Sequence, residues 1–388
     1  MTYESNCTLP NELLAQIADE GLACLPELIQ TLINTAMQIE RQQHLGVGPY
    51  ERSAERQGHA NGYKPKTVTT RVGALTFNVP QVREGNFYPH ALEKGLRSER
   101  ALMLALAEMY VQGVSTRKVA AITEKLCGWE VSSTQVSHAT SQLDSVLTQW
   151  RNRPLGPCPY LFLDARYEKV RIDGQVRDVA VLIACGVNCE GKRQILGVSV
   201  SLSEQEVHWR TFLQSLVARG LGGIHLVISD AHAGLKQARQ AVFGAVPWQR
   251  CQFHLQQNAQ AYVPRQEMKS EVAAAIRAIF NTPNRLEADS LLTKTVQLYA
   301  KRYPKLADWL EANLPEGLAV FDFPEAQRRL LRTTNGLERL NKEIKRRTRV
   351  VGIFPNEAAC LRLVTALAME CSDEWETGKV YITLSPPL

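Results

Sequence analysis

The sequence lacks the features that would place it in several broad classes of protein. It has no apolar run near the roughly 18 residues that a membrane-spanning helix needs. Its start, MTYESNCTLPNELL, has neither the basic residues nor the apolar stretch of a secretory signal. Its nine cysteines are odd in number and include no CxxC pair. We therefore expect a protein of the reducing cytoplasm that does not act at a membrane.

Nucleotide-binding and hydrolase motifs are also missing. The chain has no Walker loop GxxxxGK(S/T), no GxGxxG and no Ser-His-Asp order, so nucleotide hydrolysis and dinucleotide redox chemistry have no support. Its 388 residues, 45% hydrophobic and 22% charged, have an ordinary globular composition and are enough for two or three domains.

Positive charge is concentrated in two segments. The formal net charge is only +6, but residues 56–83 hold five Lys or Arg and no acid, and residues 327–349 hold nine against two Glu. Such patches release counterions when they meet a polyphosphate, although an Arg-rich helix face is often only solvated. Charge alone leaves both interpretations open.

The N-terminal part changes its hydrophobic period along the chain. Residues 11–45 repeat Leu and Ile every three or four positions, which predicts helix with a packing or dimerisation surface. Thr67–Val72 and Leu75–Val79 then flank Gly73-Ala74 and predict a small basic β-hairpin.

A helical period returns between residues 98 and 146 in three segments, 101–111, 115–126 and 132–147. Ser115 and then Ser132 or Ser133 are suitable N-caps, and the spacing suits a helix-turn-helix. The third helix would read DNA through short polar side chains: Ser133, Thr134, Gln135, Ser137 and His138. A helical bundle without DNA contact is the alternative.

Beyond residue 154 the pattern becomes that of strands. Residues 160–171 and 175–187 are joined by Asp173-Gly174, a strong hairpin signal, and a third strand covers 194–202. The expected continuation is a helix at 204–219, a strand at 223–228, a helix at 231–242, a short strand at 246–253 and helices from 255 to 331. This β-β-β-α-β-α-β order predicts a mixed α/β sheet covered on both faces.

Two aspartates occupy chemically informative positions in this sheet. Asp164 lies in a strand that is apolar on both faces, where an unpaired carboxylate costs several kcal/mol and should hold a cation, a base or a hydrogen-bond network. Asp230 follows the strand ending at Ile228 and would emerge at its carboxyl edge, where ligand sites often form. The alternatives are that Asp164 only reaches solvent and that Ser229 or Asp230 caps the following helix.

Glu338 lies at the start of a basic helix. Asn335 is a natural N-cap, and Glu338 would then be a capping-box glutamate. However, Lys342, Lys345 and Arg349 follow Glu338 on the same helical stripe, along which a phosphate backbone could lie. Three acids from two strands and a basic helix suit a site for two Mg²⁺ or Mn²⁺ ions that promotes phosphoryl transfer.

The segments LFLDARYEKVR, VISDAHAGLKQA, WQRCQFHLQQN and TTNGLERLNKEIKRRT, with NGYKP and the Glu206-x-x-Trp209-x-x-Phe212-Leu213 helix, resemble the mutator-type transposases of bacterial insertion sequences over residues 11–371. The resemblance implies an RNase H-like mixed sheet interrupted by an all-helical insertion, preceded by helical and helix-turn-helix DNA-binding segments. It also implies a catalytic and metal-binding triad of Asp164, Asp230 and Glu338.

On this basis we expect seven segments: a helical or dimerisation segment 1–50, a basic hairpin segment 51–95, a helix-turn-helix domain 96–150, the first part of the catalytic domain 154–254, a helical insertion 255–331, its last helices 332–372, and a tail 373–388. The expected DNA contacts are Lys64, Lys66, Arg71, Ser133, Thr134, Gln135, His138, Lys342, Lys345, Arg346 and Arg349. The family's Cys-x-x-His signature corresponds to Cys251 and His254, with a structural or DNA-facing role or a zinc half-site as alternatives.

The resulting functional hypothesis is a DNA transposase that binds the terminal inverted repeats of an insertion sequence and catalyses metal-dependent strand cleavage and transfer. Its partners would be double-stranded DNA and a second copy of the chain, in the cytoplasm at the bacterial nucleoid. The alternatives are a catalytically inactive DNA-binding regulator and an RNase H-like nuclease without transfer activity.

Overall fold

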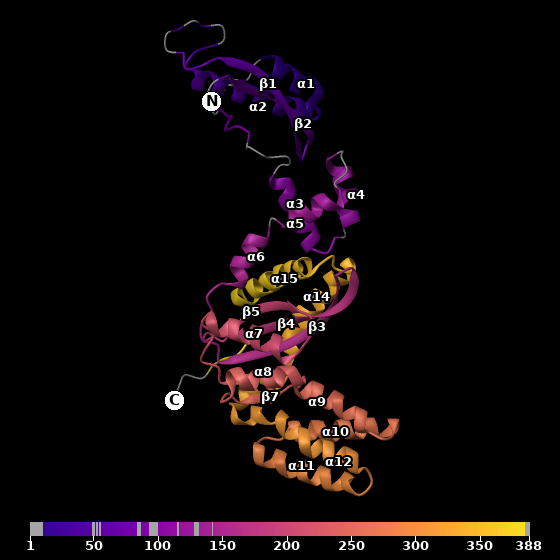
Figure 1. Cartoon of the computed structure of the whole chain (residues 1–388). Helices are drawn as coiled ribbons and strands as arrows, with labels where there is room; N and C mark the ends of the chain where they lie inside the picture. Colours follow the sequence, from indigo (N-terminus) through magenta and orange to yellow (C-terminus); the bar gives the residue numbers. More distant parts are fainter. Residues whose placement is uncertain are drawn as a thin grey trace, which may run out of the picture. The chain divides into compact units, whose positions relative to one another are not determined.

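The structure is a computed structural model that describes residues 11–48, 51, 53, 56–83, 87–92, 100–114, 116–127, 132–141 and 143–384. The chain divides into two compact units, Met1–Gln142 and Leu143–Leu388, which we call the N-terminal and the C-terminal unit and describe separately (Figure 1).

In the N-terminal unit, a helical segment packs on a β-hairpin. The elements are α1 (Asn11–Glu20), a 3-10 turn (Gly21–Cys24), α2 (Leu25–Leu45), β1 (Ala60–Thr70) and β2 (Gly73–Val82). Leu75, Phe77 and Val79 alternate along β2 and therefore share one face, which packs with Met37 of α2 and Val68 of β1.

The hairpin is present, but its turn lies two residues before the predicted Gly73-Ala74. Thr70 pairs with Gly73, so Arg71 and Val72 form the turn. The Thr70 hydroxyl donates to the Gly73 carbonyl (2.8 Å) and accepts from the N–H of Val72 (3.2 Å), which closes the turn with a side chain.

Three further helices of this unit contact one another: α3 (Arg100–Val111), α4 (Thr116–Cys127) and α5 (Ser133–Ser141). The single helix predicted over 132–147 is wrong, because its second half is a separate helix, α6 (Asp144–Arg151), in the C-terminal unit. The apolar residues of the two halves face different cores. Val136 is buried in α5, whereas Leu147 is buried in α6, which packs against α15 (Glu357–Thr377).

The C-terminal unit is built on a five-stranded mixed sheet of order β5-β4-β3-β6-β7. The strands β3, β4 and β5 are antiparallel, and β6 and β7 run parallel to β3. The bounds are β3 (Tyr160–Ile172), β4 (Gln175–Val187), β5 (Arg193–Ser201), α7 (Glu206–Ala218), β6 (Leu226–Ser229), α8 (Ala233–Phe243) and β7 (Trp248–Arg250). The predicted element order is confirmed, and so is the Asp173-Gly174 turn, where φ is 50° and 77°.

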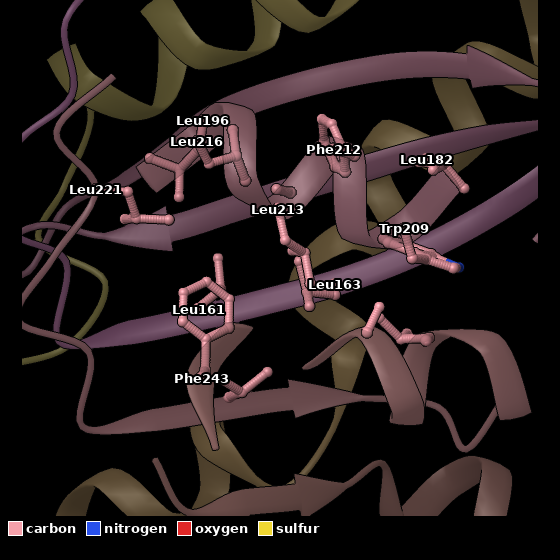
Figure 2. Close-up of a cluster of buried hydrophobic side chains, with 14 of the residues drawn as sticks. Leu161, Leu163, Leu182, Leu196, Trp209, Phe212, Leu213, Leu216, Leu221 and Phe243 are labelled. Carbon is pink, nitrogen blue, oxygen red and sulfur yellow. The ribbon is translucent and has the colours of Figure 1, made fainter. Parts of the chain in front are cut away.

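Alternate residues of β3 face opposite sides of the sheet. Leu161 and Leu163 pack with Trp209 and Leu213 of α7 in the core shown in Figure 2. Asp164 faces the other side, where it contacts α14 (Glu338–Val351). The sheet is therefore covered on both faces, as expected.

The chain between the sheet and α14 is helical, as expected. It comprises α9 (Gln252–Ala259), α10 (Lys269–Phe280), α11 (Arg285–Ala300), α12 (Pro304–Asn313) and α13 (Glu325–Leu331), together with the 3-10 turns Gln260–Tyr262, Gln266–Met268, Leu314–Gly317 and Ala319–Asp322. A last 3-10 turn, Thr334–Leu337, leads into α14. The predicted strand over 246–253 is too long, because α9 already begins at Gln252. Among the described residues, no helix is both long and apolar enough to cross a membrane.

Candidate active site

The parallel pairing of β3 with β6 aligns the two aspartates. Phe162 pairs with Ile228, and Asp164 and Asp230 each follow two residues later. Neighbouring strands lie about 4.8 Å apart, so the two carboxylates leave the backbone at the same level of the sheet. Because β6 ends at Ser229 while β3 continues to Ile172, the site opens at the edge of β3 beyond the end of β6.

Asp230 does not cap the next helix. α8 begins at Ala233, two residues later than predicted, and His232 occupies its N-cap position. The Asp230 carboxylate accepts a hydrogen bond from the N–H of Ala231 (2.7 Å), and the Ser229 hydroxyl accepts one from the Trp248 indole (2.9 Å). The capping alternative is therefore wrong, and the Asp230 side chain stays at the sheet edge.

Asp164 lies within β3 and is partly buried. One carboxylate oxygen accepts from the Asn341 amide (2.6 Å) and the other from the N–H of Ala165 (2.9 Å). Burial raises the pKa of Asp164, Asp230 adds to this, and the hydrogen bond from Asn341 opposes it. In the part of the chain that the structure describes, neither aspartate forms an ion pair with Lys or Arg, and His254 is the nearby positive group that lowers the pKa of Asp164.

Cys251 and His254 lie beside this pair of acids, at the junction of β7 and α9. Burial would raise the pKa of the Cys251 thiol, but its interactions with His254 and Thr334 outweigh burial and lower it. The interaction with Cys251 raises the pKa of His254 to about 9 against the effect of burial, and Asp230 and Asp164 raise it further. The Nδ1 atom of His254 is buried, and no described residue lies in a position to form a well-aligned hydrogen bond with it.

Thr334 contacts the Cys251 thiol from the turn that precedes α14. The thiol sulfur accepts from the backbone N–H and the hydroxyl of Thr334, each at 3.5 Å. The described side chains include no group of three or more His, Cys, Asp or Glu that could hold a metal ion. The pKa of His254, raised to about 9, favours the positively charged form of this side chain beside the two aspartates.

Glu338 is the first residue of α14, one turn before Asn341, and its side chain lies outside the described part of the structure. The prediction that Asn335 caps this helix is wrong. Leu337 occupies the N-cap position, and the N–H of Asn335 contacts the Thr333 hydroxyl (3.5 Å). The backbone of Glu338 therefore lies one helical turn from the residue that binds Asp164.

Contacts from β3 and β5 hold α14 and the turn before it in place. Arg166 donates to the Asn341 carbonyl (2.6 Å), and Thr348 donates to Glu168 (3.1 Å). Arg193 donates to the Gly336 carbonyl (3.0 Å), and its guanidinium lies 4.2 Å and 4.3 Å from the ring centres of Trp375 and Tyr381. The chain is thus attached to the sheet both before Glu338, at Gly336, and after it, at Asn341 and Thr348.

A cavity of about 520 Å³ opens at Asp164. Its lining comprises Asp164, Arg166, Tyr167, Phe253, His254, Thr334, Asn335, Asn341, Lys342 and Lys345. Of the predicted basic stripe, Lys342 and Lys345 line this cavity and Arg349 is exposed, while Arg346, predicted as a further DNA contact, pairs with Glu343 (2.9 Å). The geometry thus combines carboxylates that need positive charge with cations suited to phosphates.

The other predicted DNA contacts lie in the N-terminal unit. Lys64 and Arg71 are exposed on the hairpin, while Lys66 is half-buried and donates to the Tyr88 hydroxyl (2.8 Å). On α5, Thr134 and His138 are exposed, and the Ser133 side chain lies outside the described part. The Gln135 amide oxygen accepts from the N–H of Ser132 (2.8 Å), and the Ser132 hydroxyl accepts from the N–H of Gln135 (3.2 Å), so this pair forms a capping box.

The sequence analysis did not name five residues of the cavity: Arg166, Tyr167, Phe253, Thr334 and Asn341. Two of them carried a usable signal. Arg166 is two residues from Asp164 on the same strand, and Asn341 is one helical turn after Glu338. Phe253 was assigned to the end of a strand, where an apolar residue is unremarkable.

The comparisons with known proteins identify the family of the chain. The model of the Mutator family of transposases matches residues 5–378, and the chain belongs to this family. It is 59% identical to the transposase for insertion sequence element IS406 of Burkholderia multivorans, over 96% of each chain. It is 38% identical to the transposase for element IS256 in transposon Tn4001 of Staphylococcus aureus, over 90% of each. It is also 38% identical to the transposase for element IS1081 of Mycobacterium tuberculosis, over 96% of this chain and 91% of the relative.

A chain in the solved structure of a simian T-cell lymphotropic virus intasome, in complex with a PP2A regulatory subunit, also aligns with this protein. The identity is 10% and the TM-score 0.19, over 53% of this chain and 66% of the other, which is too low to define a shared fold.

Proposed function

We propose that this protein is a DNA transposase whose Asp164, Asp230 and Glu338 hold two Mg²⁺ or Mn²⁺ ions and catalyse strand cleavage and strand transfer. The observation that carries the proposal is the parallel register that brings Asp164 and Asp230 to the same level, without an ion pair to Lys or Arg among the described residues. Membership of the Mutator family of transposases supports the same chemistry.

The donor set fits a hard divalent cation. Mg²⁺ and Mn²⁺ prefer carboxylate oxygens, and the neighbouring strands β3 and β6 supply two carboxylates, Asp164 and Asp230, to which Glu338 would add the third. Asn341 and the N–H of Ala165 orient the Asp164 carboxylate, as outer partners of metal ligands commonly do. When bound, such ions stabilise charge on the phosphate oxygens and lower the pKa of water.

The strand arrangement supports an RNase H-like catalytic core. The first three strands form an antiparallel meander, the next two are added in parallel beside β3, and the two aspartates lie on the neighbouring strands β3 and β6. The helices α9 to α13, between β7 and α14, then correspond to an insertion that precedes Glu338.

The remaining residues of the site would bind and orient the DNA. Lys342 and Lys345 line the cavity beside Asp164 and would bind the phosphates on either side of the scissile bond. His254, with its raised pKa, keeps a positive charge beside the acids. The basic hairpin and the helices of the N-terminal unit would bind the terminal inverted repeats, with a homodimer holding two ends together.

Duplexes that carry the DNA flanking the coding sequence test the proposal. We expect the full chain to cut one strand with Mg²⁺ and to join the new 3′ end to a plasmid. Asp164→Asn and Glu338→Gln should each lower cutting about a thousandfold or more, because a ligand position supports several kcal/mol of transition-state stabilisation. Both variants should still bind the duplex when EDTA replaces the metal.

Asp178→Asn is a matched control, since Asp178 is an exposed acid of β4 outside the cavity and its loss should leave cutting unchanged. Full cutting by Glu338→Gln would remove that residue from the site. Cutting without joining would instead indicate a nuclease, and binding without cutting by the wild type a regulator.

A further inference from the structure

Two aromatic side chains at the cavity are exposed although apolar rings are normally covered. Phe253 is 53% exposed and Tyr167 is 50% exposed, and both line the cavity at Asp164. The structure describes two other large aromatic side chains as exposed, and both lie outside the cavity. Tyr63 lies under the Arg41 guanidinium (4.8 Å), and Tyr262 stacks on Trp309 (5.4 Å).

The position of Phe253 is set by a rigid backbone. It lies in the first turn of α9 between Gln252 and Leu255, which are buried. The N–H of Gln252 donates to the Arg332 carbonyl (2.9 Å), and its side-chain amide donates to the Gly317 carbonyl (2.9 Å). The exposed ring therefore results from packing on both sides of Phe253. Its one recorded ring contact is edge-on with His254, at 5.5 Å between centres.

The surroundings of the two rings suit a nucleotide. Lys342 and Lys345 of α14 line the same cavity as Asp164 and can neutralise phosphates. An aromatic ring beside such cations is the combination that binds unpaired nucleic acid, because every base has a π-face that stacks on a ring without sequence readout. The cavity volume of about 520 Å³ is ample for one base.

We propose that Phe253 and Tyr167 form a nucleobase subsite, in which a base next to the scissile phosphodiester leaves the duplex and stacks on the Phe253 ring. Tyr167 bounds the subsite from β3, where its hydroxyl interacts with Glu204. The subsite deepens the proposed function and rests on it. Stacking would hold the flanking nucleotide, and so the scissile phosphate, in place beside Asp164.

The test begins with the wild-type full chain and a fluorescein-labelled duplex of the flanking DNA, on which the Mg²⁺-dependent cut is mapped. Binding is then measured by anisotropy with Ca²⁺ in place of Mg²⁺, on the intact duplex and on duplexes with one abasic site at successive positions around the cut. The proteins are wild type, Phe253→Ala, Phe253→Leu, Phe253→Trp and, as an exposed aromatic outside the cavity, Tyr262→Ala.

We expect Phe253→Ala and Phe253→Leu to bind the intact duplex about tenfold more weakly, within the range for one base on one aromatic ring. Phe253→Trp and Tyr262→Ala should bind as the wild type does. At one abasic position, wild type and Phe253→Ala should bind equally, because the base that stacks is gone. Tyr167→Ala should show the same position dependence, and Tyr167→Phe should not.

Equal binding of the intact duplex by wild type and Phe253→Ala overturns the subsite. So does wild-type binding by Phe253→Leu, or a tenfold loss that persists at every abasic position. Matching melting temperatures of the variants keep a folding defect out of the comparison. These outcomes differ from failure of the proposed function, which would appear earlier, as a wild-type protein that does not cut the duplex with Mg²⁺.

Discussion

At the scale of single residues, the site depends on how strongly each neighbour favours the charged form of Asp164. Burial and the Asp230 charge favour the protonated form, while the Asn341 amide and the N–H of Ala165 favour the carboxylate. A metal ligand must be deprotonated, so the balance between these effects sets the lowest pH at which the site can bind an ion.

This balance gives a prediction for Asn341→Ala. The Asn341 hydrogen bond lowers the pKa of Asp164, so its loss should raise that pKa, and the fraction of carboxylate at a given pH should fall. The acidic limb of the pH profile of Mg²⁺-dependent cutting should therefore move to higher pH, with most of the activity recovered at alkaline pH. Single-turnover cutting across the pH range measures the shift.

Thr348→Val is the control for this experiment. It removes another hydrogen bond between α14 and β3, from Thr348 to Glu168, without touching Asp164. It should lower stability slightly and leave the acidic limb in place. If both variants shift the limb equally, the effect comes from loosening α14 and not from the Asn341 amide.

Part of the site could be predicted because strand patterns carry it. Asp164 in an apolar strand and Asp230 after a short strand both follow from the sequence, and the parallel register then aligns them. Asn341 and Phe253 could not be found in this way. Asn341 binds Asp164, which lies 177 positions away in the sequence. The exposure of Phe253 at the cavity depends on where β7 ends and α9 begins.

At the scale of elements, the order of strands and helices was predictable, whereas their ends were not. The Asp173-Gly174 turn was found because both residues adopt positive φ, which is a local property. The turn at Arg71-Val72 was not predicted because the Thr70 side chain closes it. The end of α5 was not predicted because the helical period of the sequence continues into α6. Competing local solutions of similar energy are decided by tertiary packing.

A C-terminal strap, which we define as residues 379–384, leads to a prediction at this scale. The N–H groups of Tyr381 and Ile382 donate to the Gly191 carbonyl (2.9 Å and 3.0 Å), and Ile382 is 2% exposed. A Cβ atom on Gly191 would lie 1.9 Å from the Ile382 carbonyl oxygen. The strap also carries Tyr381, which packs on Arg193 beside the turn before Glu338.

Gly191→Ala should therefore displace the strap, and Gly174→Ala is its matched control. The two glycines have φ of 76° and 77°, but the Cβ of Gly174 would meet open space. Gly174→Ala should lower the free energy of unfolding by about 1–2 kcal/mol through backbone strain alone. Gly191→Ala should lose about 1.5–3 kcal/mol more as Ile382 becomes exposed. Equal losses in urea unfolding of the two variants would contradict the steric role of Gly191.

At the scale of the whole molecule, the two units carry different parts of the proposed function. The sheet, both of its helical coverings and the cavity at Asp164 all lie within 143–388. The basic hairpin and the helices α3 to α5 lie within 1–142, where a separate small core supports the hairpin. Chemistry and recognition of the DNA ends are therefore expected to be separable.

A fragment of residues 143–388 tests this division. Because its core is complete among the described residues, it should unfold cooperatively. It should bind DNA through α14, but its preference for the flanking DNA over unrelated DNA should fall from a typical value of about 10³ to near one. A fragment of residues 1–142 should retain the preference and cut nothing. Competition binding at a fixed salt concentration measures both ratios, since phosphate contacts weaken steeply with salt. Full preference in the 143–388 fragment would place recognition in the C-terminal unit and leave the hairpin and α5 without the role proposed for them.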